Sequence, residues 1–199
     1  MTDAVFLSGW AGPETLFPGL SERVRFVTPF LDGDEATLLA TLETHRTRLL
    51  AGWSTGAHMI VKHAARLLPL FERVVLVAPF LRFADSFPPR VTRTMAAGLR
   101  NDPEGTTRAF WKNCGIGGDP PWQADWAGPL AAGLAYLLTS AAPGTPVPAD
   151  HVTILHGRDD RIVRRAAVEK VLAALPGARL VSIPGGHYPD AAALADQLF

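Results

Sequence analysis

Gly52-Trp53-Ser54-Thr55-Gly56 is the stretch that decides the fold, because it matches the G-x-S-x-G pattern of a nucleophile elbow. Residues 46–51 before it end in apolar side chains and predict a buried strand, and residues 57–68 after it predict a helix. A serine on such a sharp turn lies next to the positive end of a helix dipole. The pattern fixes only three residues, so the strand before it and the helix after it are what favour a true elbow.

Strands and helices alternate along most of the chain. Apolar runs predict strands at residues 5–7, 23–27, 46–51, 73–78, 152–157 and 179–183. Periodic apolar positions predict helices at 33–45, 57–68, 164–174 and 190–199, with Asp190 as a candidate cap of the last one. This rhythm predicts an α/β fold, with a mostly parallel sheet of about six strands and helices on both faces.

The alternation breaks between about residues 81 and 147, where we expect a helical insertion and not a second domain. Pro88-Pro89 precedes a stretch with helical character at 90–100. Asp102-Pro103 is typical of an N-cap followed by proline at the first helical position, which predicts a second helix. A third amphipathic helix is predicted by a stripe of leucines, Leu130, Leu134, Leu137 and Leu138. A chain of 199 residues fits a single domain, which we expect to span 1–199.

Composition and charge exclude several classes of protein. Nineteen basic and nineteen acidic residues cancel, so no overall attraction to nucleic acid or to anionic membranes is predicted. Cys114 is the only cysteine in the sequence, which excludes an internal disulfide and a cysteine metal cluster. His58 and His63 do not form H-E-x-x-H, so no metal site is predicted. The first residues lack the features of a signal peptide, and no uncharged run is unbroken enough to cross a bilayer, so we expect a soluble cytoplasmic protein.

A serine hydroxyl becomes a useful nucleophile when a base takes its proton and a carboxylate orients that base. His187 lies in a glycine-rich loop directly after the last predicted strand, where such a base is expected. Asp159 and Asp160 follow the preceding predicted strand, and either could supply the carboxylate. The order Ser54, Asp160, His187 is the chain order of α/β-hydrolases.

These motifs together resemble the α/β-hydrolase family along nearly the whole chain. Gly157-x-x-Asp160-x-x-Val163 resembles the acid loop of the family, which favours Asp160 over Asp159, and Gly186-His187-x-Pro189 resembles its histidine loop. Gly9-Trp10 resembles the loop whose backbone amide forms half of the oxyanion hole. The resemblance implies that the amides of Trp10 and Thr55 hold the oxyanion.

The chain departs from the family pattern at a few places, none of which removes a catalytic group. Ser8 and Ala11 stand where the family often has histidine and glycine, and Arg164 replaces a common proline. The chain begins at what resembles the third strand of the family. The two edge strands before it are therefore expected to be missing, which would leave a sheet edge that a partner subunit could cover.

Within the family, the elbow and the Gly9-Trp10 loop resemble the carboxylesterases that cleave the methyl ester of pimeloyl-acyl carrier protein in biotin synthesis. Residues 94–111 and 130–137 resemble the lid of those esterases. Phe83, Phe87, Phe110 and Trp111 are then expected to line an acyl channel, and Trp10, Phe110 and Trp111 are the expected substrate contacts. In the alternative reading, the aromatic side chains of the insertion simply fix it to the body.

Basic residues outnumber acidic ones by six to three from Arg82 to Lys112. This excess of positive charge could dock an acidic carrier protein or a phosphopantetheine phosphate, through Arg90, Arg93, Arg100 and Arg108. The alternative is an ordinary solvated helix face.

The sequence therefore predicts a serine carboxylesterase that needs no metal or organic cofactor and acts on a small acyl ester, with an acyl carrier protein as a candidate partner. Two other readings keep the fold. One is a general short-chain carboxylesterase, thioesterase or acyltransferase, and the other is a non-catalytic binding protein.

Overall fold

The computed structural model describes residues 3–44, 47–189 and 191–199 of the chain. The predicted end of helix 33–45, the predicted start of strand 46–51 and the candidate cap Asp190 lie outside the described residues.

The described residues form one sheet of six strands in the order β2-β1-β3-β4-β5-β6, and every neighbouring pair is parallel. The strands are β1 (Ala4–Leu7), β2 (Arg25–Val27), β3 (Leu49–Trp53), β4 (Arg73–Val77), β5 (Val152–Gly157) and β6 (Arg179–Ile183). The chain runs outward from β1 to β2, then returns to β3 and proceeds the other way. In open parallel sheets, sites form at the carboxyl ends of strands where the direction reverses, which here is between β1 and β3.

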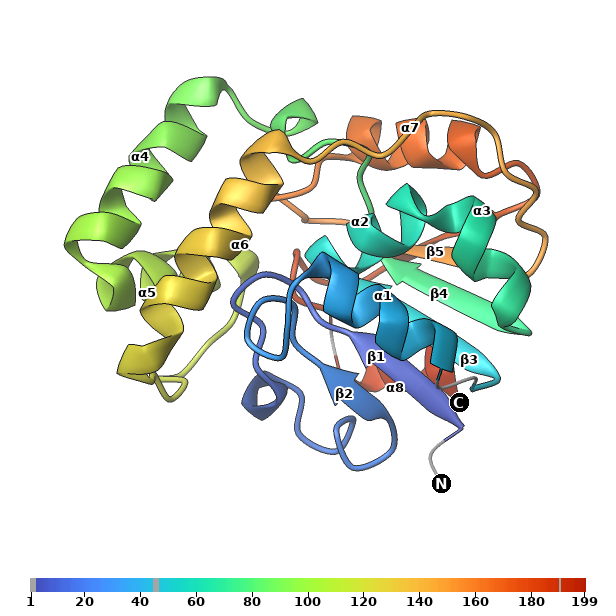
Figure 1. Cartoon of the computed structure of the whole chain (residues 1–199), viewed down its shortest axis with the longest axis horizontal. Helices are drawn as coiled ribbons and strands as arrows, with labels where there is room; N and C mark the ends of the chain where they lie inside the picture. Colours follow the sequence, from blue (N-terminus) through green and yellow to red (C-terminus); the bar gives the residue numbers. More distant parts are fainter. Residues whose placement is uncertain (1–2, 45–46, 190) are drawn as a thin grey trace.

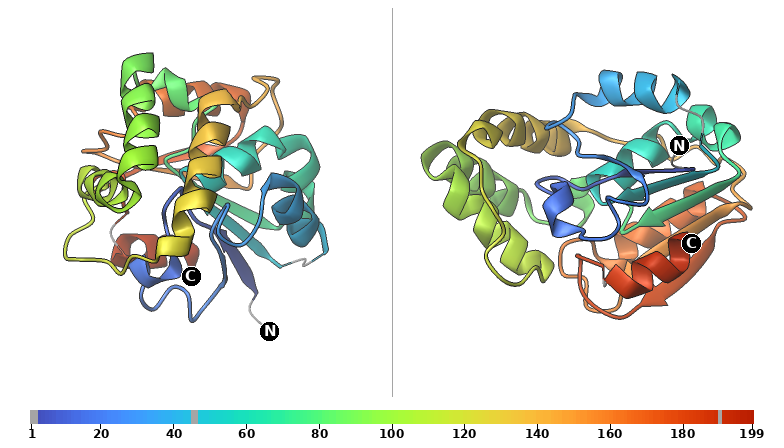
Figure 2. Two further views of the ribbon diagram at one scale, coloured as in Figure 1. Left: turned by 60° about the vertical axis from the view of Figure 1, so that its left-hand side comes forward. Right: turned by 90° about the horizontal axis from the view of Figure 1, so that it is seen from below.

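Helices cover both faces of the sheet, as predicted (Figures 1 and 2). One face carries α1 (Glu35–Thr44), α2 (Thr55–Lys62), α3 (Ala64–Leu67), the 3-10 turn η2 (Leu68–Leu70) and α7 (Arg165–Ala174), and the other carries η1 (Glu14–Leu16) and α8 (Ala191–Leu198). A hydrophobic core lies on each face of the sheet, and alternate side chains of β1 belong to different cores. Val5 and Leu7 belong to the first core, and Phe6 belongs to the second. This division follows from the two-residue period of a strand.

Residues between β4 and β5 form a helical insertion beyond the carboxyl ends of the strands (left in Figure 1). Its elements are η3 (Phe83–Asp85), α4 (Pro89–Asn101), α5 (Pro103–Cys114), η4 (Ala124–Trp126) and α6 (Ala127–Thr139). Asp102 caps α5, since its Oδ1 accepts a hydrogen bond of 2.9 Å from the Gly105 amide. Helix α4 packs against both α5 and α6, so the three helices form one layer over the site described below.

Among the helices that the structure describes, none combines the length and the apolar character needed to cross a membrane.

Candidate active site

Ser54 lies on the turn between β3 and α2 in a backbone conformation that few residues other than glycine adopt, with φ of 53° and ψ of −109°. Its amide donates to Val77 O at 2.8 Å, and its carbonyl accepts from the His58 amide at 2.8 Å. The ends of β4 and α2 therefore hold the strained turn in place. Strain of this kind persists only where surrounding structure fixes it, and it places the hydroxyl at the tip of the turn.

Two glycines allow this turn to approach its neighbours. A Cβ atom on Gly56 would lie 2.2 Å from Leu7 O, and one on Gly52 would lie 2.9 Å from the Ala57 amide nitrogen. Both distances are far below contact, so no other residue fits without moving backbone. The G-x-S-x-G spacing is thus explained by the contact of the elbow with β1 on one side and with its own helix on the other.

Three loops bring the predicted catalytic side chains into one hydrogen-bonded chain. Ser54 Oγ lies 2.9 Å from His187 Nε2, and His187 Nδ1 lies 2.9 Å from Asp160 Oδ2. A neutral imidazole with its proton on Nδ1 satisfies both contacts, since it donates to the carboxylate and accepts from the serine hydroxyl. The Asp159 side chain makes no such contact with the histidine and lies on an exposed residue, so the geometry favours Asp160 between the two aspartates.

The Asp160 carboxylate is fully covered by protein, with a side-chain exposure of 0%. Burial alone would raise the pKa of Asp160, but the charge and hydrogen bond of His187 outweigh it, helped by the Val163 and Ile162 amides, so the pKa falls below its ordinary value. Those two amides donate to Asp160 Oδ1 at 2.9 Å and 2.8 Å, respectively. The site therefore keeps this carboxylate ionised and fixed in direction.

Cys114, at the end of α5, is buried near the same carboxylate. Burial, and then the negative charge of Asp160, raise the pKa of the thiol well above its ordinary value. The side chain is therefore a neutral thiol at physiological pH, and it is a poor nucleophile.

Three buried tryptophans fix the loops around Ser54 through their indole N–H groups. Trp53 donates to His187 O at 2.8 Å, Trp10 to Leu130 O at 2.8 Å, and Trp111 to Ala11 O at 2.6 Å. The first bond ties the elbow to the histidine loop, and the other two tie the insertion to the Gly9-Trp10 loop. Sequence reasoning missed the contact from Trp53, and no sequence signal identifies it because its acceptor lies 134 residues away.

The predicted oxyanion donors lie beside each other, next to Ser54. Thr55 is the first residue of α2, and an amide at that position has no partner within its own helix. The Trp10 amide donates to the Thr55 hydroxyl at 3.1 Å. Both residues are buried, so the contact between the Trp10 amide and the Thr55 side chain is shielded from water.

Two of the predicted substrate-binding side chains, Phe110 and Trp111, contact the loop that carries the third, Trp10. Phe110 meets the Trp10 ring edge-on, with centroids 4.8 Å apart. Trp111 is only 2% exposed and bonds Ala11, so its indole also fixes the insertion to the body, as the alternative reading expects. Ser54 is 4% exposed and His187 2% exposed. The candidate nucleophile and base therefore have little contact with solvent in this structure.

The four arginines of the predicted docking surface differ in their surroundings. Arg90, Arg93 and Arg100 are exposed residues of α4, and within the described part of the chain they form no ion pair. Arg108 on α5 pairs with Glu104 at 2.7 Å and also with Asp119. Three of the four guanidinium groups are thus open to a partner, while the fourth is held inside the insertion.

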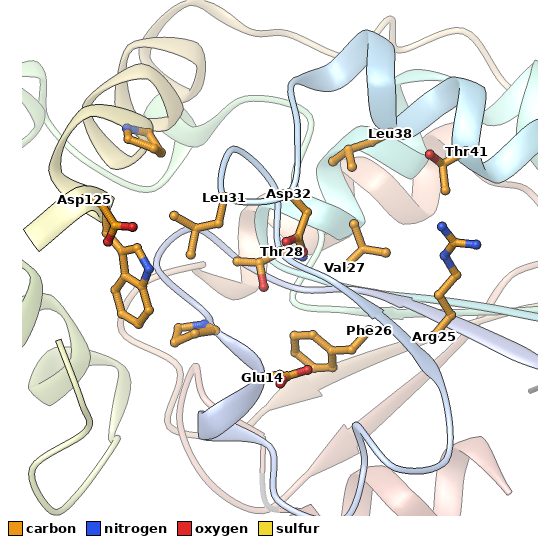
Figure 3. A pocket seen from close by; sticks show the side chains of 13 residues that line it. Glu14, Arg25, Phe26, Val27, Thr28, Leu31, Asp32, Leu38, Thr41 and Asp125 are labelled. Carbon is orange, nitrogen blue, oxygen red and sulfur yellow. The ribbon is translucent and has the colours of Figure 1, made fainter. Parts of the chain in front are cut away.

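Residues of the insertion line two hollows, the first in part and the second entirely. The first, of about 540 Å³, lies at the open edge of β2 between Arg25, Glu14 and Asp125, and its lining does not include Ser54 or His187 (Figure 3). The second is a largely apolar groove of about 670 Å³ between α4 and α5, and its lining includes Arg90, Met95 and Phe110. Phe110 lines the second hollow and contacts Trp10, which connects that hollow to the candidate active site.

Within the described residues, no group of three or more His, Cys, Asp or Glu side chains is arranged to hold a metal ion. His58 is engaged otherwise, since its two ring nitrogens contact Phe80 O and Ser140 Oγ.

The chain is similar in sequence and fold to known proteins. The chain is 27% identical to the pimeloyl-[acyl-carrier protein] methyl ester esterase of Nitrosomonas europaea, over 94% of this chain and 89% of that protein. Among solved structures, an enol-lactonase from Burkholderia xenovorans superposes with a TM-score of 0.67 at 18% identity, covering 94% of this chain and 85% of its own. BioG from Haemophilus influenzae gives 0.61 at 18% identity, covering 93% and 88%. At such identities the two structures show a shared fold alone.

The sequence profile of the alpha/beta hydrolase family matches residues 4–197, nearly the whole chain. The parallel sheet, the elbow on β3 and the helical insertion after β4 agree with that match. The chain belongs to the alpha/beta hydrolase family.

Proposed function

We propose that this protein is a serine carboxylesterase that hydrolyses an acyl ester through an acyl-enzyme. The single observation that carries the proposal is the chain of contacts from Ser54 Oγ to His187 Nε2 and from His187 Nδ1 to Asp160 Oδ2, each 2.9 Å long. A binding protein has no need for a nucleophile, a base and a buried orienting carboxylate in hydrogen-bonding order. The esterase from Nitrosomonas europaea supports the same reaction class.

In the proposed reaction, His187 Nε2 takes the proton of Ser54 Oγ as that oxygen bonds to the ester carbonyl carbon. The carbonyl oxygen becomes an oxyanion, which the Trp10 and Thr55 amides stabilise. The C–O bond to the alcohol then breaks, and the alcohol leaves with the proton from His187. Water repeats the sequence on the acyl-enzyme, releasing the acid and restoring the serine. Asp160 keeps the imidazole in the tautomer that both steps require.

Hydrolysis of p-nitrophenyl esters with two to eight acyl carbons, by the wild type and by Ser54→Ala, tests this proposal. We expect turnover by the wild type and a loss of about 10⁴- to 10⁶-fold in the variant, because no other group replaces the nucleophile. Release of p-nitrophenol at 405 nm measures the rate. A wild type inactive on every ester, or a fully active Ser54→Ala, would contradict the proposal.

For the substrate class, we propose a methyl ester of an acyl chain that is carried by an acyl carrier protein. The pimeloyl-[acyl-carrier protein] methyl ester of biotin synthesis is most consistent with this class. The named activity of the 27% identical relative supports this assignment. Two features of the insertion also support it. Arg90, Arg93 and Arg100 offer unpaired positive charge to an acidic carrier, and the groove between α4 and α5 is lined by both Arg90 and Phe110.

Charge reversal on α4 tests the carrier proposal. We expect Arg93→Glu to lower kcat/KM for a carrier-linked methyl ester about tenfold relative to a free methyl ester, because charge on an interface rim changes the rate of association. Added salt should weaken the same preference in the wild type. Arg179→Glu, at an exposed residue of β6 away from the insertion, is the matched control. Equal effects of the two reversals, or no salt dependence, would contradict carrier docking on this surface.

One observation favours the second candidate, a general short-chain carboxylesterase, thioesterase or acyltransferase. Arg108, the fourth arginine of the predicted docking surface, is already paired with Glu104 and Asp119 and has less charge to offer a carrier. A rate that is the same for free and carrier-linked esters would favour this candidate.

A further inference from the structure

The Thr55 hydroxyl occupies the acceptor position of the Trp10 amide. Trp10 N lies 3.1 Å from Thr55 Oγ1, and Thr55 has no exposed surface while Trp10 is 2% exposed. Water therefore has little access to this amide in the closed structure. A buried amide without an acceptor would be costly, and the threonine hydroxyl removes that cost.

The loop that carries the Trp10 amide is fixed from several sides. Within the loop, Ser8 Oγ donates to Gly12 O at 2.5 Å, and the Gly12 amide donates to Gly9 O at 3.1 Å. The indoles of Trp10 and Trp111 tie the same loop to the insertion. The direction of the Trp10 N–H is thus set by the loop, and a change of hydrogen-bond partner has to come from the threonine.

The proposed oxyanion hole requires the same N–H group that Thr55 now holds. One N–H makes one strong, well-aligned hydrogen bond, so the hydroxyl and a developing oxyanion compete for it. A threonine in a helix populates two χ1 rotamers, and a turn of this one bond removes Oγ1 from the amide without moving the loop.

Resting on the proposed function, we propose that Thr55 is a positioning residue whose hydroxyl is a stand-in acceptor for the Trp10 amide and is displaced by the oxyanion of the tetrahedral intermediate. While the oxyanion hole is empty, the hydroxyl accepts the hydrogen bond of the Trp10 amide and so stabilises the free protein. The same bond has to be broken in the transition state, so it lowers the affinity of the hole for the oxyanion.

Valine at position 55 separates the two effects, because it keeps the shape of threonine and removes the acceptor. In the free variant the buried Trp10 amide then has no hydrogen-bond acceptor, and only the oxyanion can provide one. The variant should therefore lose stability while it gains affinity for an oxyanion. A purely structural hydrogen bond would produce the loss without the gain.

An alkyl trifluoromethyl ketone provides the test. Ser54 Oγ adds to its carbonyl carbon, His187 receives the serine proton, and the ketone oxygen becomes an oxyanion held in the hole. We expect Thr55→Val to bind this inhibitor about three- to tenfold more tightly than Thr55→Ser, which retains a hydroxyl, and to melt at a lower temperature. KM for an ester should differ less between these two variants than the inhibition constant does.

Each other outcome has a definite meaning. Equal inhibitor affinity in the two variants would show that the hydroxyl only supports the fold, and weaker binding to Thr55→Val would show that the hydroxyl donates to the oxyanion. Either result overturns the inference while leaving the esterase proposal intact, since adduct formation by the wild type tests the latter separately. If Thr55→Val does not fold, Thr55→Ala removes the same acceptor and makes the same comparison with Thr55→Ser.

Discussion

Two adjacent aspartates follow β5, and the surroundings of their side chains differ. Asp160 is buried against His187 and receives two backbone amides, whereas Asp159 lies on the surface of the same turn. We expect Asp160→Asn to lower kcat for ester hydrolysis about 10⁴-fold, because an amide no longer fixes the productive tautomer of the imidazole. Asp159→Asn is the matched control and should remain within a few-fold of the wild type. The p-nitrophenyl ester assay checks both, and the reverse ranking would identify Asp159 as the acid.

Much of the candidate site could be predicted from single residues and their spacing, since the order of Ser54, Asp160 and His187 and the strand before each one depend only on sequence. The choice between Asp159 and Asp160 depended on a motif resemblance, because neighbouring residues in a loop have equal local chemistry. The hydrogen bonds of the Trp53 indole and of the Trp10 amide could not be predicted from the sequence. Each joins segments at least 45 residues apart, and only the folded chain brings their partners together.

At the level of elements, the strands were predicted best because parallel strands buried on both faces are nearly continuous apolar runs. The predicted bounds of β5 and β6 agree with the structure. The predicted strand 46–51 ends two residues early, since β3 continues through Trp53 to the elbow itself. Gly52 interrupts the strand pattern of β3, because glycine is uncommon inside strands. The structure requires glycine at this position because helix α2 approaches it closely.

The helix predicted at 57–68 differs from the observed pair α2 and α3. Helix α2 begins earlier, at Thr55, because the elbow leads directly into its first turn. It ends at Lys62, and His63 has a backbone φ of −111° and a ψ of 25°, outside the helical range. The His63 ring bonds Glu35 of α1 at 3.1 Å. Apolar periodicity continues across this break, so the pattern could not show it.

At the scale of the whole molecule, His58 links three separate parts of the fold. From α2, its Nδ1–H donates to Phe80 O after β4 at 3.0 Å, and its Nε2 accepts from Ser140 Oγ, directly after α6, at 2.8 Å. The ring also stacks on Phe80 with centroids 4.9 Å apart. The elbow helix and the end of the insertion are therefore joined by an imidazole that satisfies both contacts in its neutral form.

This histidine makes the stability of the whole molecule depend on pH. Burial lowers the pKa of His58 to about 4, and the positive charges of Lys62 and His63 lower it while the Phe80 carbonyl and Glu35 act in the opposite direction. The unfolded chain has the ordinary histidine pKa of about 6.5 and takes up the proton first as pH falls. The stability that His58 contributes is thus present above about pH 6.5 and is lost as pH falls toward 4, by about 3 kcal/mol in total.

Urea unfolding of the wild type and of His58→Gln at several pH values between about 7 and 4 measures this contribution. We expect the variant to be less stable at neutral pH, because glutamine cannot reproduce the stacking and both hydrogen bonds. Its stability should fall less steeply with acid, because glutamine does not titrate. His151→Gln, at a partly buried histidine bonded to Leu68 O, is the matched control for the loss of a histidine elsewhere in the fold. If the free energy of unfolding has the same pH slope in the wild type and in His58→Gln, protonation of His58 does not govern acid unfolding. If the slope is flatter in His58→Gln alone, the acid sensitivity of the fold is due to His58.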